Sequence, residues 1–279
     1  MHIGATTDSR SYRRAVAAGR ARMASAGRRP WIGAATVLGL AILWYVLTTA
    51  TGAVSPARFP RPADVWSAAL QLTLRGYAGG TLWLQIWYSS RLVLLGFLVA
   101  AATGVPLGLL MGMSRRAEAL INPAFLLIRP IPPLAWIPLA IVWFGLGDAA
   151  KIFVIWFAAF VPALINTYTG VRTLDRTLIA AARVHGASER QILTEVMIPG
   201  ALPLIFTGLR LSLQASWTTL VAAELVGAFF GLGRVLIIAA QDIYPGMIAF
   251  AMALVAILGA LMTGCLGLLE RWAVPWRRT

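Results

Sequence analysis

Long blocks of apolar residues without charges constrain this chain more than any other feature of its sequence. Hydrophobic residues occupy 59% of the 279 positions. Charged residues occupy 12%, against roughly 25% in an ordinary soluble domain. The apolar residues are contiguous instead of alternating with polar ones, and a run of about 20 of them can cross the hydrocarbon core of a bilayer as a helix. The sequence therefore predicts an all-α integral membrane protein.

About six transmembrane helices are predicted from these blocks. The expected spans are 31–50, 92–113, 120–144, 152–170, 202–226 and 243–269. A short amphipathic helix is expected at 63–74, near the outer surface. Prolines after Arg129 are expected to bend the third span, because they remove backbone donors. The predicted organisation is a basic tail (1–30), a first span with the amphipathic segment (31–85), the main transmembrane domain (86–271) and a C-terminal tail (272–279).

The net charge of +14 reports topology better than it reports a nucleic-acid partner. No groove-reading motif accompanies the charge, and the basic residues lie at the ends of apolar blocks. With six spans, the N-terminal tail, Arg115 and Arg116, the segment 171–195 and the C-terminus all fall on one side, with 16 of the 24 basic residues. Cytoplasmic flanks accumulate such residues, so both termini are predicted to be cytoplasmic.

Several kinds of chemistry are not expected of this chain. Cys265 is the only cysteine and the chain has two histidines, which argues against a disulfide and a histidine-based metal site. The only lysine, Lys151, stands between Ala150 and Ile152, whereas a phosphate-binding loop ends in Gly-Lys-Ser or Gly-Lys-Thr. We therefore expect no ATPase site, no enzymatic activity and no bound cofactor.

A polar segment at 174–198 separates the fourth and fifth spans and is predicted to form two short helices that meet at Gly186. Asp175 can cap the first helix, and Ser188 with Gln191 can form a capping box for the second. Pro199 is expected to end the second helix. From the residues alone, the segment fits an amphipathic loop on the membrane surface and a docking surface for another protein equally well.

The segment resembles the coupling motif of binding-protein-dependent ABC importer permeases. That motif is Glu-Ala-Ala, three residues, Gly, nine residues, then Ile-x-Leu-Pro. Ala181, Ala182, Gly186 and Pro199 match it, while Ala180 stands where the motif has glutamate. The resemblance implies that an ATPase subunit docks here. The implied coupling residues are Ala180, Ala181, Ala182, Gly186, Ala187, Ser188 and Pro199.

Two further stretches resemble the nitrate, sulfonate and taurine permease group. They are 129–147, which begins Arg-Pro-Ile-Pro-Pro, and 216–233, which contains Glu224 and ends in Gly-Leu-Gly. The resemblance implies the type I ABC importer permease fold in the cell inner membrane. It also implies separate ATPase subunits that use ATP and magnesium, an extracytoplasmic binding protein and a second permease copy. The implied substrate is a small anion such as a sulfonate, taurine or nitrate.

Charges interrupt three of the predicted spans at Arg129, Arg210 and Glu224. A charge at the centre of a span costs about 2.5 to 3.5 kcal/mol on insertion scales, so these side chains are expected to face the bundle interior. One hypothesis is that both arginines make the path electropositive, with Pro132 nearby and Glu224 pairing one arginine or shaping the gate. The alternatives are a structural ion pair or an arginine that snorkels to the interface.

Two other functions are compatible with the sequence. The same importer class also carries cyclic vitamin precursors, by resemblance. A secondary transporter is less favoured, because midplane ion sites and internal repeats are expected of that class and neither is found.

Overall fold

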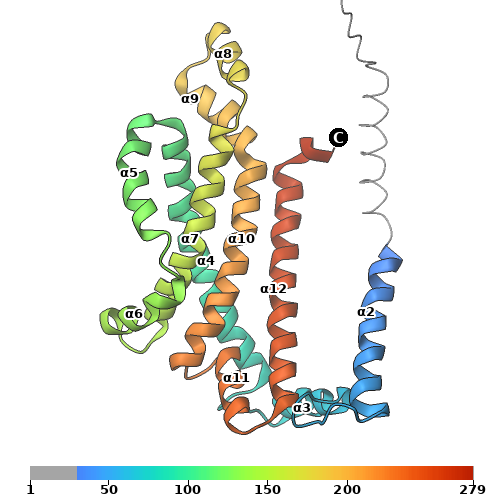
Figure 1. The fold of residues 1–279 in the computed structure, drawn as a ribbon. Helices are drawn as coiled ribbons and strands as arrows, with labels where there is room; N and C mark the ends of the chain where they lie inside the picture. Colours follow the sequence, from blue (N-terminus) through green and yellow to red (C-terminus); the bar gives the residue numbers. More distant parts are fainter. Residues whose placement is uncertain (1–29, 279) are drawn as a thin grey trace, which may run out of the picture. The chain divides into compact units, whose positions relative to one another are not determined.

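The computed structural model describes residues 30–278, so the predicted tail 1–30 lies outside the described residues except for Pro30. Within this range the regular elements are helices, apart from an isolated bridge between Tyr77 and Gly80 (Figure 1). The chain divides into two compact units, the first ending at Pro62 and the second beginning at Ala63. The all-α prediction is confirmed.

The first unit contains one long apolar helix. Helix α2 (Pro30–Tyr45) continues into a π-helical turn, Val46–Ala50, and together they form a candidate span at Trp31–Ala50. The indole Nε1 of Trp44 donates to the carbonyl of Pro60 at 2.9 Å, which holds the following loop against the helix. The first predicted span is confirmed.

Four more candidate spans lie in the second unit. They are α4 (Leu82–Met113), α7 (Asp148–Arg172), α10 (Ile198–Gly227) with the turns that precede it, and α12 (Pro245–Ala273). Helix α4 begins ten residues before the predicted second span, so that Arg91 lies inside it. A further helix, α11 (Leu232–Gln241), was not predicted.

The third predicted span is a broken pair of helices instead of one bent helix. Helix α5 (Arg115–Ile128) and helix α6 (Ile137–Phe144) meet at an angle of 83°, with a 3-10 turn, Pro133–Trp136, between them. Three prolines at 130, 132 and 133 explain the break, because none of them can donate a backbone hydrogen bond. Counting the pair as one span gives six spans, and counting it as none gives five.

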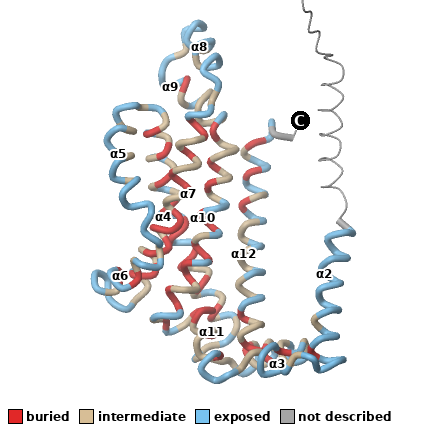
Figure 2. The backbone as a smooth tube through the Cα atoms, in the orientation of Figure 1, coloured by how far each residue is buried: buried red, intermediate tan, exposed pale blue. Residues whose placement is uncertain are grey.

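Helices α4, α7 and α10 form the centre of the second unit, where buried residues are concentrated (Figure 2). Glycines spaced by four on α4 face α7. A Cβ at Gly108 would lie 2.7 Å from the carbonyl oxygen of Leu164, and one at Gly104 would lie 3.0 Å from Ala163. Small residues let membrane helices approach closely, so this pair packs through its backbones.

Helix α3 (Pro62–Leu74) is amphipathic, as predicted. Ala68 and Leu72 are fully buried against α11 and α12, whereas Trp66 remains 67% exposed. The helix belongs to the second unit, with the elements that it covers.

Candidate functional site

The predicted corner exists between α8 (Arg176–Val184) and α9 (Glu189–Gln191). It projects beyond the ends of α7 and α10 (Figure 1). Gly186 has a φ of +79°, a conformation that other residues rarely adopt. Its amide donates to the carbonyl of Arg183, and the amide of Ala187 donates to the carbonyl of Ala182, both at 3.0 Å. These bonds form the Schellman motif that ends many helices at a glycine.

The predicted caps of both short helices are also present. The side chain of Asp175 accepts from the amide of Thr177 at 2.9 Å, and this bond holds the pKa of the Asp175 carboxyl below its usual range. Ser188 and Gln191 form the reciprocal capping box. Across the corner, Arg183 pairs with Glu189 at 3.0 Å. The corner is therefore held by contacts between residues close in sequence.

Pro199 does not end the second short helix, as the sequence had suggested. It lies in the first turn of α10, where a missing donor is tolerated. A π-helical turn, Ile192–Met197, joins α9 to α10, so that 189–227 forms one continuous helical rod. The corner is thereby connected directly to a membrane span.

The residues predicted to couple to an ATPase lie on an open surface. Ala180, Ala181, Gly186 and Ser188 are exposed, and Ala182, Ala187 and Pro199 are half-buried. No residue of α8 is buried, and the apolar Val184 is 86% exposed. A Cβ at Gly186 would meet nothing within 4 Å. The corner therefore presents an exposed surface on which small and apolar side chains lie among charged ones.

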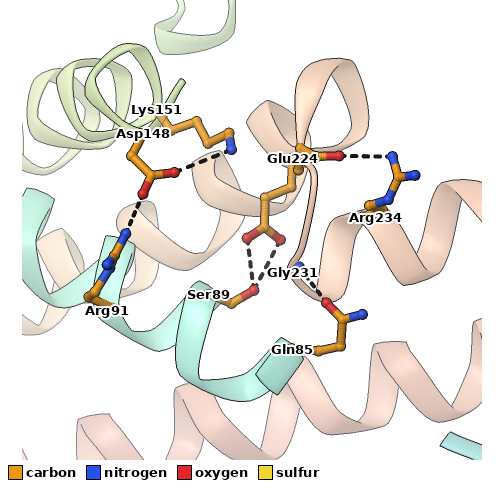
Figure 3. Close-up of polar contacts among 9 residues, drawn as sticks. Gln85, Ser89, Arg91, Asp148, Lys151, Glu224, Gly231 and Arg234 are labelled. Carbon is orange, nitrogen blue, oxygen red and sulfur yellow. Dashed lines mark hydrogen bonds and ion pairs between the residues drawn. The ribbon is translucent and has the colours of Figure 1, made fainter. Parts of the chain in front are cut away.

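A buried polar cluster occupies the other end of the rod, around Glu224 (Figure 3). Glu224 is 1% exposed, and its carboxylate accepts from the amide of Gly233 at 2.7 Å and from the hydroxyl of Ser89 at 2.8 Å. The Ser89 oxygen accepts from the amide of Leu232 at 2.9 Å, and Gln85 accepts from the amide of Gly231 at 2.5 Å. Three side chains thus bind three successive amides at the start of α11. We call Gln85, Ser89, Glu224 and the amides 231–233 the α11 anchor.

The α11 anchor explains why glycines flank Leu232. Gly231 has a φ of +123°, and a Cβ there would overlap the Glu224 carboxylate. A Cβ at Gly233 would lie 2.5 Å from the Cβ of Glu224. The Gly-Leu-Gly sequence is therefore what lets this backbone approach a buried carboxylate.

Charged groups beside the α11 anchor form a second cluster that sequence reasoning missed. Arg91 pairs with Asp148, and Lys151 lies 3.7 Å from the same carboxylate while only 8% exposed (Figure 3). From the sequence, Lys151 shows only that the chain has no phosphate-binding loop, and this cluster was not predicted. The spacing of Gln85 and Ser89, four residues apart at the start of a span, was the available signal for the anchor.

The other predicted path residues lie elsewhere. Arg210 pairs with Glu270 of α12. Among the described residues, Glu224 forms no ion pair with Arg129 or Arg210, and its carboxylate accepts from Ser89 and the Gly233 amide. The expectation that Glu224 pairs one of them is therefore wrong. Arg129 and Pro132 are exposed at the break between α5 and α6. Of the three charges expected to face the bundle interior, Glu224 is buried within this chain, whereas Arg129 and Arg210 are exposed on it.

Arg210 does line a groove between α10 and α12. The groove has a volume of about 800 Å³. Its polar lining residues are Arg210, Gln214, Thr218 and Thr263, and Trp217 and Gly259 lie among the apolar ones. The groove therefore places a guanidinium group, paired on one side with Glu270, among neutral hydrogen-bonding side chains. Guanidinium groups with such neighbours can recognise small anions.

Comparison with known proteins places this architecture among transport proteins. Residues 104–279 match the family model described as "binding-protein-dependent transport system inner membrane component". The chain is 37% identical to the taurine transport system permease protein of Escherichia coli over 246 residues, 88% of each chain. It is 35% identical to the bicarbonate transport system permease protein of Synechococcus elongatus, over 85% of this chain and 87% of the relative.

A solved structure supports the fold. An inward-facing form of the MetNI methionine ABC transporter aligns with a TM-score of 0.56 at 24% identity. The alignment covers 69% of this chain and 97% of the other. The likeness at this identity concerns the fold alone.

Proposed function

This chain belongs to the family of binding-protein-dependent transport system inner membrane components, and we propose that it forms the membrane path of a small anionic solute. We propose further that a separate ATPase binds the α8–α9 corner and drives the transport. The chain is an ABC importer permease of the cell inner membrane. The observation that carries the proposal is the ordered but uncovered corner, with its small side chains and its continuous connection to α10.

The corner is assigned to the cytosol. Six arginines cluster at this end of the second unit, namely Arg115, Arg116, Arg172, Arg176, Arg183 and Arg190. Helix α12 also ends there, followed by the C-terminal arginines (Figure 1). Basic residues accumulate on cytoplasmic flanks, which supports a cytoplasmic C-terminus. A soluble binding protein would then deliver substrate at the α3 and α11 end.

The partners follow from the family. We assign ATP and magnesium to separate ATPase subunits, and we assign the second half of the membrane path to another permease copy. When ATP closes the ATPase pair, the motion enters at the corner and the rod 189–227 carries it across the membrane to the α11 anchor. The spans then rock between inward and outward openings.

Gly186→Val tests this coupling. Valine is β-branched and disfavours the left-handed backbone that the corner requires. We expect the importer to assemble, while substrate-stimulated ATP turnover in reconstituted vesicles falls to near its basal rate. Gly186→Asn is the matched control, because asparagine tolerates positive φ. Undiminished stimulation in the valine variant would contradict the proposal.

The groove beside Arg210 supports an anionic substrate, as do relatives named for taurine and bicarbonate. A cyclic vitamin precursor has no comparable support. The test is uptake of a sulfonate by Arg210→Gln/Glu270→Gln, a double variant that removes both charges of the pair together. We expect normal expression and a clear loss of uptake. Unchanged uptake would assign the pair a purely structural role.

A further inference from the structure

A second cavity lies under α8, where it meets the ends of α4, α5 and α7. Its volume is about 450 Å³, within the range of small-ligand sites. Four arginines line the cavity, namely Arg115, Arg172, Arg176 and Arg183. Glu189 is the one acidic residue in the lining. We propose that this cavity binds a phosphate-bearing anion, with the acidic phospholipids of the membrane as its source.

Two of the four arginines are available to a ligand. Arg172 already pairs with Glu118 at 3.3 Å, and Arg183 pairs with Glu189 at 3.0 Å. Arg115 and Arg176 have no acidic partner within 4 Å in the part of the chain that the structure describes. A guanidinium group can donate two parallel hydrogen bonds to a phosphate, so two such groups suffice for strong recognition.

The two arginines without an acidic partner both stand at helix starts. Arg115 is the first residue of α5, and Arg176 is the first residue of α8. Ser114 caps α5, and the Asp175 carboxylate caps α8 and offsets its helix dipole. The positive charge available to a ligand therefore comes from the guanidinium groups.

Ala180 is what leaves the cavity open. Ala180 lies in the wall of the cavity, four residues after Arg176 and three before Arg183. This spacing places all three residues on the same face of α8. The resembled coupling motif has glutamate at this position. A glutamate there would lie one helical turn from Arg176, within reach of an ion pair, and would place a carboxylate in the cavity wall. Its replacement by alanine leaves the charge of Arg176 for a ligand.

The apolar part of the lining favours a lipid over a soluble anion. The apolar side chains of the wall are Met113 at the end of α4, with Val171, Leu174, Ile179, Ile192 and Met197. Helices α4 and α7 are candidate spans that end at this cavity, so a bilayer around them would bring its headgroups close to it. Basic pockets between membrane helices are known to hold acidic headgroups. The site itself does not depend on the proposed transport function, and only its assignment to the cytosolic leaflet does.

The test measures lipid retention by the purified full-length chain after mild delipidation. Vesicles containing phosphatidylglycerol are compared with vesicles of phosphatidylcholine alone, and bound lipid is counted by native mass spectrometry. We expect wild type to retain phosphatidylglycerol preferentially. Arg115→Gln/Arg176→Gln should lower this retention about 30-fold, since each arginine near the surface contributes about 1 kcal/mol. Ala180→Glu should lower it about fivefold, because its carboxylate offsets the charge of one arginine, which contributes about 1 kcal/mol near the surface.

Two controls separate the site from general surface charge. Arg116→Gln/Arg190→Gln removes the same charge at the same end but outside the lining, and should retain phosphatidylglycerol as wild type does. Ala180→Gln adds similar bulk without charge and should lose less lipid than Ala180→Glu. The proposal is overturned if Arg116→Gln/Arg190→Gln loses as much lipid as the cavity double variant, or if Ala180→Gln loses as much as Ala180→Glu. Equal retention of both lipids by wild type would exclude the lipid as the source of the phosphate.

A soluble source is distinguished by a separate measurement. Inorganic phosphate is added to the lipid-free chain, and thermal unfolding is followed. Suppose that phosphate stabilises wild type but not Ala180→Glu, while wild type shows no preference for phosphatidylglycerol. This result would support the phosphate site, with a soluble anion as its ligand. If neither lipid nor phosphate distinguishes wild type from the cavity variants, the proposal fails.

Discussion

The two ends of the rod 189–227 are built in opposite ways. At the α11 anchor, three buried side chains bind three successive backbone amides, and two of these side chains, Gln85 and Ser89, come from a distant part of the chain. At the α8–α9 corner, every stabilising bond joins residues close in sequence, and the surface is open. The polar contacts of one end join residues far apart in sequence, whereas those of the other join near neighbours and leave its outer surface exposed to a partner.

The largest difference in stability is expected between two glycine-to-alanine variants, one at the positive-φ glycine of each end. Gly231→Ala places a Cβ against the Glu224 carboxylate in a backbone region that is essentially restricted to glycine. We expect it to lower the free energy of unfolding by about 3 kcal/mol or more. Gly186→Ala meets open space, so it should cost only about 1 to 2 kcal/mol of backbone strain.

Thermal unfolding of the full chain in detergent, followed by helical circular dichroism, measures both glycine variants. Equal losses of unfolding free energy at Gly231 and Gly186 would contradict the prediction that the anchor tolerates a Cβ less well than the corner does.

Removal of one capping side chain at each end gives the next largest effect. Glu224→Ala leaves the Gly233 amide and the Ser89 hydroxyl without their acceptor, at about 2 to 4 kcal/mol. Glu224→Gln keeps one acceptor oxygen and should recover part of this loss. Ser188→Ala removes the cap of α9 and should cost about 1 kcal/mol. The midpoint of thermal unfolding ranks the three variants, and a larger effect at Ser188 would reverse the comparison.

The smallest effect concerns the ion pair that crosses the corner. The side chains of Arg183 and Glu189 are 60% and 80% exposed. A double-mutant cycle with Arg183→Gln and Glu189→Gln should give a coupling energy below about 0.5 kcal/mol, because solvent and salt screen exposed pairs. The same unfolding measurement at low and high salt checks this. A coupling above about 1 kcal/mol would show that the corner is less open than its exposure indicates.

The elements predicted well are those with local signals. The corner at Gly186 and the capping box of Ser188 with Gln191 depend on residues within five positions of one another. The first span is a continuous apolar run, and its predicted bounds agree with the structure. Helix α11 was missed because its ten residues are too short to signal a span, and its start is set by side chains from α4 and α10.

Ion-pair partners were not predictable in the same way. Glu224, Arg210 and Arg129 were each recognised as charges that interrupt apolar spans. No local pattern selects among their possible partners, and in the structure Arg210 pairs with Glu270 while Glu224 accepts from Ser89. The break between α5 and α6 was expected only as a bend, because prolines remove donors without setting the angle of 83°.

The amino-acid sequence by itself determined that this chain crosses a membrane, where it turns at the corner, and which residues cap the two short helices. Those features depend on hydrophobic transfer and on hydrogen bonds that close within one or two helical turns. Tertiary structure alone decided that Ser89 meets Glu224, because these residues are 135 positions apart and nothing local selects between distant polar groups. Only the packed helices bring the donor and the acceptor to one buried point.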